Sequence, residues 1–109
     1  MSDESDSKVA EARAEALALA RRQRAMDMRS VMATPPGRRF VWRYLNEMGV
    51  FGGSYAPGDA LATAYNEGRR SAGLGLQAEL RRLCAADYVR MHAEVMAQVE
   101  LDAELMPDE

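Results

Sequence analysis

The pattern of apolar and polar positions predicts a long first helix. No Gly or Pro occurs between Lys8 and Ala33, and Ser7 before this segment is a suitable N-cap. Apolar residues form a thin series along this segment, at Val9, Ala12, Ala16, Leu19 and Met26. The sequence Thr-Pro-Pro-Gly at 34–37 ends the helix, because proline lacks an N–H donor and restricts the residue before it. The apolar series is mostly alanine and buries little area, so we expect this helix to need a partner.

A second helix is predicted from Arg38 to Met48. Gly49 is placed to end it, because the residue after a C-cap usually needs a positive φ. The loop at 50–58 contains three Gly and one Pro, and we expect Phe51 and Tyr55 to anchor it on the folded body. The apolar positions of the helix form one broad face, with Trp42 on its flank: Phe40, Val41, Tyr44, Leu45 and Met48.

Two further helices follow. Asp59 is a plausible N-cap for a helix that continues to about Leu83, and its glycines at 68, 73 and 75 indicate a close helix–helix approach or a kink near Gly73. Asp87 is a plausible cap for a last helix from Tyr88 to about Leu105. No segment alternates as a strand would. The predicted fold class is all-α, a small bundle or hairpin of about four helices with a long N-terminal helix.

Composition agrees with a folded, soluble protein, and charge divides the chain into three parts. The 109 residues are 48% hydrophobic and 28% charged, too apolar for wholesale disorder and too charged for a membrane span. The net charge is −3 over residues 1–7, +6 over 8–82 and −6 over 83–109. We interpret residues 1–7 as a disordered acidic tail. The basic segment could face a polyanion, or the acidic C-terminal helix could lie against the Arg-rich helices, which requires no additional partner.

Residues that carry chemistry are scarce. A single cysteine, Cys84, excludes an internal disulfide, and with only one histidine, His92, a zinc site or a histidine-based relay lacks ligands. No serine has a neighbouring histidine as a base. Glu67 could form an ion pair with Arg70, or be buried against an arginine of the second helix. We therefore expect no catalytic residues, no metal and no cofactor, and expect that the protein is not an enzyme.

Arginines form the one charged cluster that could bind a ligand. With Trp42 and Tyr44 available for stacking, this cluster could follow a phosphate backbone. The isoelectric point of about 5.2 is low for a dedicated nucleic-acid-binding domain, and a solvated, ion-paired helix face is the simpler interpretation. The possible phosphate contacts are Arg21, Arg22, Arg24, Arg38, Arg39 and Arg43.

Two motifs stand out, the first in GRRFVWRYLNEMGVF at 37–51 and the second in YNEGRRSAGLGL at 65–76. Together they resemble the Bbp-nineteen-like phage domain, found in small proteins of tailed bacteriophages that are commonly encoded near packaging and portal genes, with Tyr65 where the family usually has Phe. The resemblance covers roughly residues 37–92. The matching residues are Arg38, Arg39, Phe40, Trp42, Leu45, Gly49 and Phe51 in the first motif, and Asn66, Glu67, Gly68, Arg69, Arg70, Gly73 and Leu74 in the second.

The resemblance implies a phage or prophage protein without defined catalytic residues, and a role in the virion or as an accessory of head assembly. We expect a long helix at 8–33 for docking or oligomerisation and a helical domain at 34–106. The expected partners are phage structural or packaging proteins and further copies of the chain, with no membrane. The alternative is a DNA-binding packaging accessory that resembles a small terminase subunit. The acidic N-terminus does not resemble a signal peptide, so we expect the virion or the host cytoplasm as the location.

Overall fold

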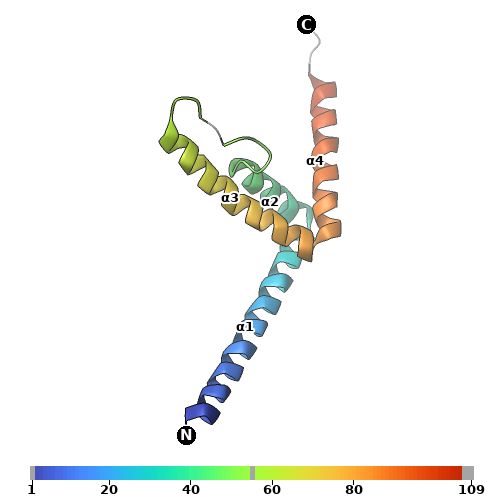
Figure 1. Cartoon of the computed structure of the whole chain (residues 1–109). Helices are drawn as coiled ribbons and strands as arrows, with labels where there is room; N and C mark the ends of the chain where they lie inside the picture. Colours follow the sequence, from blue (N-terminus) through green and yellow to red (C-terminus); the bar gives the residue numbers. More distant parts are fainter. Residues whose placement is uncertain (1, 55, 107–109) are drawn as a thin grey trace.

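The computed structural model describes residues 2–54 and 56–106, and all regular structure in these residues is helical (Figure 1). This confirms the predicted all-α class. The four helices, in chain order, are α1 (Ser2–Met32), α2 (Pro35–Glu47), α3 (Ala60–Leu83) and α4 (Ala85–Leu105). None of the helices within the described residues is both long and apolar enough to cross a membrane.

The molecule consists of a packed body from which two helices project (Figure 1). In the body, α2 and α3 pack against each other, against the C-terminal end of α1 and against the first half of α4. We call residues 2–23 of α1 the N-terminal arm and residues 96–106 of α4 the C-terminal arm. The arms leave the body in different directions, and the molecule measures 82 × 40 × 16 Å. Its radius of gyration is 20.4 Å, whereas a compact domain of this length has about 13 Å.

The first helix begins earlier than the sequence predicted. The disordered tail expected at 1–7 and the N-cap expected at Ser7 are wrong for the described residues, because α1 starts at Ser2. The segment contains no Gly or Pro to stop it. Asp3 and Glu4 lie in the first turn, where carboxylates interact favourably with the free N–H groups and the helix dipole.

The corner between α1 and α2 depends on Gly37. The second helix begins at Pro35, three residues before the predicted start, because both prolines occupy its first turn, where a missing N–H costs nothing. The Thr34 hydroxyl caps the helix by accepting from the Gly37 N–H at 3.3 Å. A Cβ atom at Gly37 would lie 1.8 Å from the carbonyl oxygen of Val31. Only glycine therefore allows α2 to start this close to the last turn of α1.

Gly49 ends α2 as predicted, with φ of +79°. The Val50 N–H donates to the Leu45 carbonyl at 3.1 Å and the Gly49 N–H to the Asn46 carbonyl at 3.0 Å, which is the hydrogen-bond pattern of a Schellman motif. Val50 and Leu45 are both buried in the core, so the motif also returns the chain to the body. Tyr55, the other expected anchor of the loop, lies outside the described residues.

The third helix has the predicted cap, and the fourth does not. The Asp59 carboxylate accepts from the Ala62 N–H at 2.9 Å. By contrast, α4 starts at Ala85, directly after a one-residue joint at Cys84, so Asp87 lies inside the first turn and is not the cap. Of the three glycines expected to mark a close helix–helix approach, only Gly73 lies close to another segment. A Cβ there would lie 2.5 Å from a methyl group of Val50, in the turn after α2, whereas a Cβ at Gly68 or Gly75 would meet no atom within 4 Å.

The core lies where the four helices meet, and its composition differs from the face predicted for α2. Phe40 and Tyr44 were expected in the core, but they are exposed, Phe40 by 61%. Arg38 takes a buried position instead, with 5% exposure. The buried apolar residues are Met32, Val41, Leu45, Val50, Leu80, Cys84, Tyr88 and Met91.

Candidate functional site

An aromatic cluster joins α2, the following loop and α4. Trp42 stacks on Phe51 with ring centroids 4.4 Å apart and an angle of 20° between the planes. The His92 ring meets Trp42, Phe51 and Tyr88 edge-on, at 5.2, 5.6 and 4.6 Å. The Tyr88 hydroxyl accepts from the Gln77 amide at 2.7 Å, which adds α3 to the cluster. His92 is therefore not the surface imidazole that the sequence suggested.

The environment of His92 favours its neutral form. Its Nε2 atom is buried and has no hydrogen-bond partner among the described residues. Burial lowers the pKa of the His92 imidazole, and the nearby positive charge of Arg81 lowers it further. The ring thus acts as an aromatic packing element at neutral pH.

The second sequence motif holds the loop that follows α2. The Glu67 carboxylate accepts from the Ser54 hydroxyl, and the Asn66 amide donates to the Ser54 carbonyl at 3.3 Å. Arg70 Nε donates to the Gly52 carbonyl at 3.2 Å. Glu67 and Arg70 both bind the loop, so neither the expected ion pair between them nor the expected burial of Glu67 against an arginine of α2 describes their role.

Arg69 extends this network to the end of α2. Its guanidinium donates to the Glu47 carbonyl at 2.9 Å and lies over the Tyr65 ring, 5.5 Å from the centroid. The last carbonyls of a helix have no partner within the helix, so a cation there satisfies an acceptor and interacts favourably with the dipole. The NEGRR sequence at 66–70 is thus a clamp from α3 onto the loop and the end of α2.

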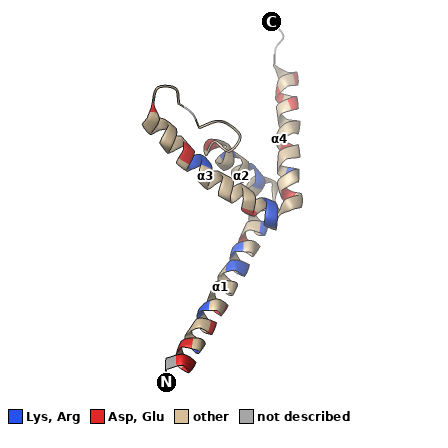
Figure 2. Cartoon of the chain, viewed as in Figure 1, with Lys and Arg blue, Asp and Glu red and all other residues tan. Residues whose placement is uncertain are grey.

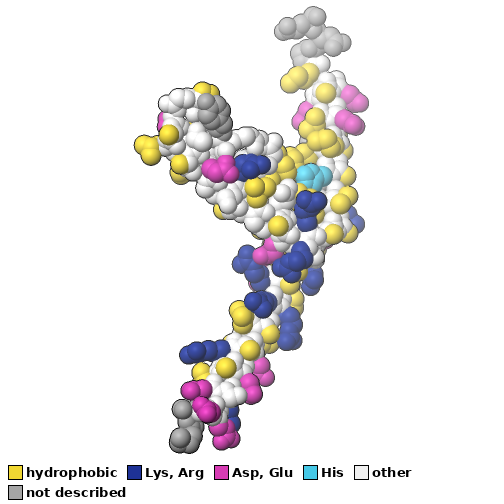
Figure 3. All heavy atoms as spheres, in the orientation of Figure 1, with side chains coloured by type: hydrophobic (Ala, Val, Ile, Leu, Met, Phe, Trp, Pro, Cys, Tyr) yellow, Lys and Arg dark blue, Asp and Glu magenta, His cyan; other side chains and the backbone are white. Residues whose placement is uncertain are grey.

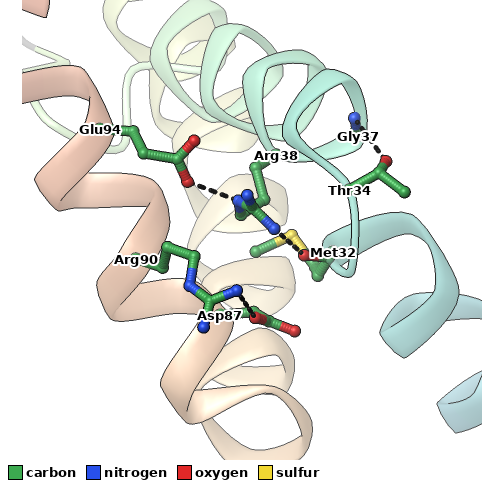
Figure 4. A network of polar contacts seen from close by, with 7 residues as sticks. All are labelled: Met32, Thr34, Gly37, Arg38, Asp87, Arg90 and Glu94. Atoms are coloured by element: carbon green, nitrogen blue, oxygen red, sulfur yellow. Dashed lines mark hydrogen bonds and ion pairs between the residues drawn. The ribbon is translucent and has the colours of Figure 1, made fainter.

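Arg38 connects three helices within the body (Figure 4). Its Nε donates to Glu94 Oε1 on α4 at 2.5 Å, and its Nη1 donates to the carbonyl of Met32 at the end of α1 at 3.0 Å. The Arg38 side chain is 6% exposed and that of Glu94 37%. These contacts and its burial leave the Arg38 guanidinium little accessible to a phosphate group, so Arg38 is the least accessible member of the predicted phosphate-binding set.

The remaining arginines of the predicted phosphate-binding set lie in three separate places, with Arg22 on the N-terminal arm beside Glu15 and Leu19. Arg24 pairs with Glu79 at 2.6 Å, a hydrogen bond that raises the pKa of Arg24. Arg21 and Arg24 line one groove with Glu79, Arg82 and Leu83, between α1 and the end of α3. Figure 2 shows basic residues on α1 and at this junction. A second groove, about 330 Å³ in volume, lies between α2 and α4 and is lined by Arg39, Trp42, Arg43, Glu94, Val95, Gln98 and Val99.

The two arms leave both apolar and charged side chains exposed (Figure 3). Every described side chain from Asp3 to Arg24, and every one from Met96 to Met106, is exposed. The expectation that the acidic C-terminal helix lies against the Arg-rich helices holds only for Glu94, which pairs with Arg38. In Figure 2 acidic residues lie along the part of α4 that extends beyond the body. The molecule therefore presents two exposed helical arms, of which the C-terminal one is acidic and the N-terminal one carries charges of both signs.

A protein-family model places the chain among known sequences. The model of the Bbp19-like phage protein matches residues 28–93, which is more than half of the chain. The chain therefore belongs to this family. The match begins at Met28, the first side chain that packs against the core, and ends directly after His92 in the aromatic cluster. No curated protein and no solved structure matches the chain significantly.

Proposed function

We propose that this member of the Bbp19-like phage protein family is a small accessory protein that acts through protein–protein contacts, in the virion or during head assembly and DNA packaging. The helical domain at 34–106 is the folded module, and α1 is the docking element. The partners are phage structural or packaging proteins and further copies of the chain.

The observation that carries the proposal is the amount of surface left uncovered. The chain exposes 8391 Å², whereas a compact monomer of 12.1 kDa exposes about 6,000 Å² by the usual scaling with mass. The difference is about three times the area of roughly 800 Å² that one partner contributes to a standard interface. An isolated helix in water gains little from local propensity alone, so an arm of this length is favoured by a partner that packs against it.

A second candidate function, nucleic-acid binding, is favoured by one observation. Arg21, Arg22, Arg39 and Arg43 are all exposed. Arg21 lies on one groove beside Glu79, and Arg39 and Arg43 lie on another beside Glu94. Arg22 lies apart from both, beside Glu15. This arrangement lowers the local positive potential and divides the contacts, so protein docking remains the first proposal.

Binding of purified chain to head, portal and terminase proteins of the same phage tests the proposal, with short duplex DNA as the competing ligand. We expect a complex with a head or packaging protein that Leu19→Asp disrupts. Leu17→Asp is the matched control, because Leu17 and Leu19 are 51% and 60% exposed on opposite sides of the same helix. Binding to DNA alone, with a steep loss as salt increases and a further loss in Arg21→Ala/Arg22→Ala, would instead establish the second candidate.

A further inference from the structure

The groove between α2 and α4 combines an apolar floor with two exposed cations. Trp42 on α2 and Val95 and Val99 on α4 form the apolar part, and Arg39 and Arg43 lie on the α2 side. Both arginines are exposed, and neither forms an ion pair with a described residue. The one carboxylate in the lining already pairs with the buried arginine of α2. The groove therefore fits an apolar segment that carries a negative charge.

The C-terminal arm continues the α4 side of this groove. Positions 95, 99, 102 and 106 are spaced by four, three and four, so their side chains share one side of α4, which we call the inner face. Val99 and Met106 are 54% and 72% exposed, and Asp102 between them is exposed as well. In Figure 1 the second half of α4 runs clear of α2 and α3. No described part of the chain therefore covers the outer half of the inner face.

The charge of the C-terminal arm matches the groove. No Lys or Arg follows Arg90 in the sequence, and residues 96–106 carry a net charge of −3. The carboxylate on the inner face is that of Asp102, which accepts from the amide of Gln98, itself a lining residue of the groove, at 2.9 Å. A chain cannot place this arm in its own groove, because the same helix forms one wall of it. The arm of a second copy can enter, and it brings apolar side chains and the carboxylate together.

The acidic start of α1 is a poorer match for the same groove. Residues 2–11 also carry a net charge of −3, but Val9 is the only large apolar side chain among them. Such a segment would leave most of the apolar floor uncovered, and apolar area that stays in contact with water contributes nothing to association. The C-terminal arm is thus the segment of the chain that satisfies both properties of the groove.

We propose that the C-terminal arms of two copies pack antiparallel, each in the groove of the other. The two-fold axis passes beside Val99, so position 95 lies opposite 103 and position 92 opposite 106. Asp102 lies opposite position 96 of the other copy, within the stretch 94–99 that forms the groove together with Arg39 and Arg43. One two-fold contact thereby fills both grooves. This inference rests on the proposed function, since it identifies the surface through which copies of the chain associate.

This register keeps the other carboxylates of α4 out of the contact. Glu94, Glu100 and Glu104 each lie about 100° or more around the helix from Val99, and so point away from the second helix. Glu94 also retains its pair with Arg38. Asp102 is then the acidic residue that enters the contact, where it meets two cations rather than another carboxylate.

Light scattering after size exclusion tests the apolar part of the contact on the full chain. We expect the wild type at about twice 12.1 kDa and Val99→Asp at the mass of a single chain. Leu101→Asp is the matched control and should associate as the wild type does. Leu101 is 52% exposed, close to the value for Val99, but lies on the opposite side of the helix. Both side chains lie outside the core, and circular dichroism checks that the helices remain.

Exchanging the charges tests which residues meet. Asp102→Arg should weaken association, and so should Arg39→Glu/Arg43→Glu, because each brings like charges together across the contact. A chain that carries all three substitutions should associate again, since the opposite charges are restored in exchanged positions. Glu100→Arg is the control for Asp102→Arg: it makes the same change in net charge on a side of α4 that faces away, and should leave association unchanged.

The outcomes separate this contact from the proposed function. A monomeric wild type, equal disruption by Leu101→Asp and Val99→Asp, or no recovery in the triple variant would overturn the contact. A monomer that still binds a head or packaging protein overturns the contact alone. Conversely, a dimer that responds to the variants as expected but binds no phage protein overturns the proposed function and leaves the contact in place.

Discussion

Replacing Arg38 should show how much of the stability of the body depends on one buried guanidinium. In Arg38→Met the Met32 carbonyl loses its donor and Glu94 loses its cation. An unsatisfied buried carbonyl costs about 1–3 kcal/mol, and a hydrogen bond to a charged group contributes about 1.5–3 kcal/mol. Glu94 is partly exposed and can turn to water, which recovers some of this. We expect a loss of about 2–4 kcal/mol in the free energy of unfolding.

Removing the partner carboxylate, Glu94, should cost more of the free energy of unfolding than removing Arg38. Glu94→Ala leaves a buried cation without its countercharge, and breaking a buried pair from that side typically costs about 3–5 kcal/mol. The double variant should cost less than the two single losses combined, because neither charge is then left alone. Arg39→Met is the matched control: Arg39 is the adjacent residue and is exposed, so we expect a change within about 0.5 kcal/mol.

Urea unfolding of the wild type and the four variants measures these losses, with helical circular dichroism and the fluorescence of the single tryptophan as two probes. For a slope of about 1–2 kcal/mol per molar urea, the expected losses move the midpoint by 1 M or more. If Arg38→Met and Arg39→Met are equally stable, or if Glu94→Ala costs less than Arg38→Met, the description of Arg38 as a buried link between three helices is wrong.

Three further predictions concern stability. Gly37→Ala should lower the free energy of unfolding by about 1–3 kcal/mol, because the new Cβ clashes with the Val31 carbonyl. Gly68→Ala should raise the free energy of unfolding by up to about 1 kcal/mol, because a Cβ there meets no atom within 4 Å. Denaturant titration compares the two variants. Trp42→Ala should cost about 3 kcal/mol in the same assay through loss of the aromatic cluster, and no change would mean that its ring is available for a partner. Burial lowers the pKa of His92 in the folded state, so the unfolded chain takes up a proton first and the melting temperature should fall as the pH drops below about 6.5; His92→Phe should remove this part of the pH dependence.

The helix ends that the sequence predicted correctly have a local stereochemical signal. Asp59 supplies a carboxylate three residues before the N–H that it caps, and Gly49 supplies a positive φ. The start of α4 lacks such a signal. Cys84 makes no capping hydrogen bond with its side chain, and the position of Ala85 is set by the tight joint that carries Cys84 and Tyr88 into the core. Packing sets the start of α4, so the cap predicted at Asp87 was wrong.

For a similar reason, the sequence could not predict that Arg38 is buried on α2 while Phe40 and Tyr44 are exposed. Hydrophobicity alone places two aromatic residues inside and a guanidinium outside. Arg38 is buried because a carboxylate 56 residues later in the chain, and the last turn of α1, provide its acceptors. The clamp at 66–70 is another case, because most of its acceptors are backbone carbonyls, and every residue has one. The motif was recognisable from the sequence, but its role was not.

The limits of the family match separate the two parts of the molecule. Residues 28–93 contain the aromatic cluster, the clamp at 66–70 and Arg38, and all three hold the body together. The match thus covers residues whose contacts are internal, and these contacts explain the motifs without a ligand. Both arms fall outside the match. An internal scaffold that fixes the directions of two exposed helices leaves the arms as the surfaces that can meet other molecules. Substitutions in the arms should therefore change what the protein binds, and substitutions in the body should change whether it folds.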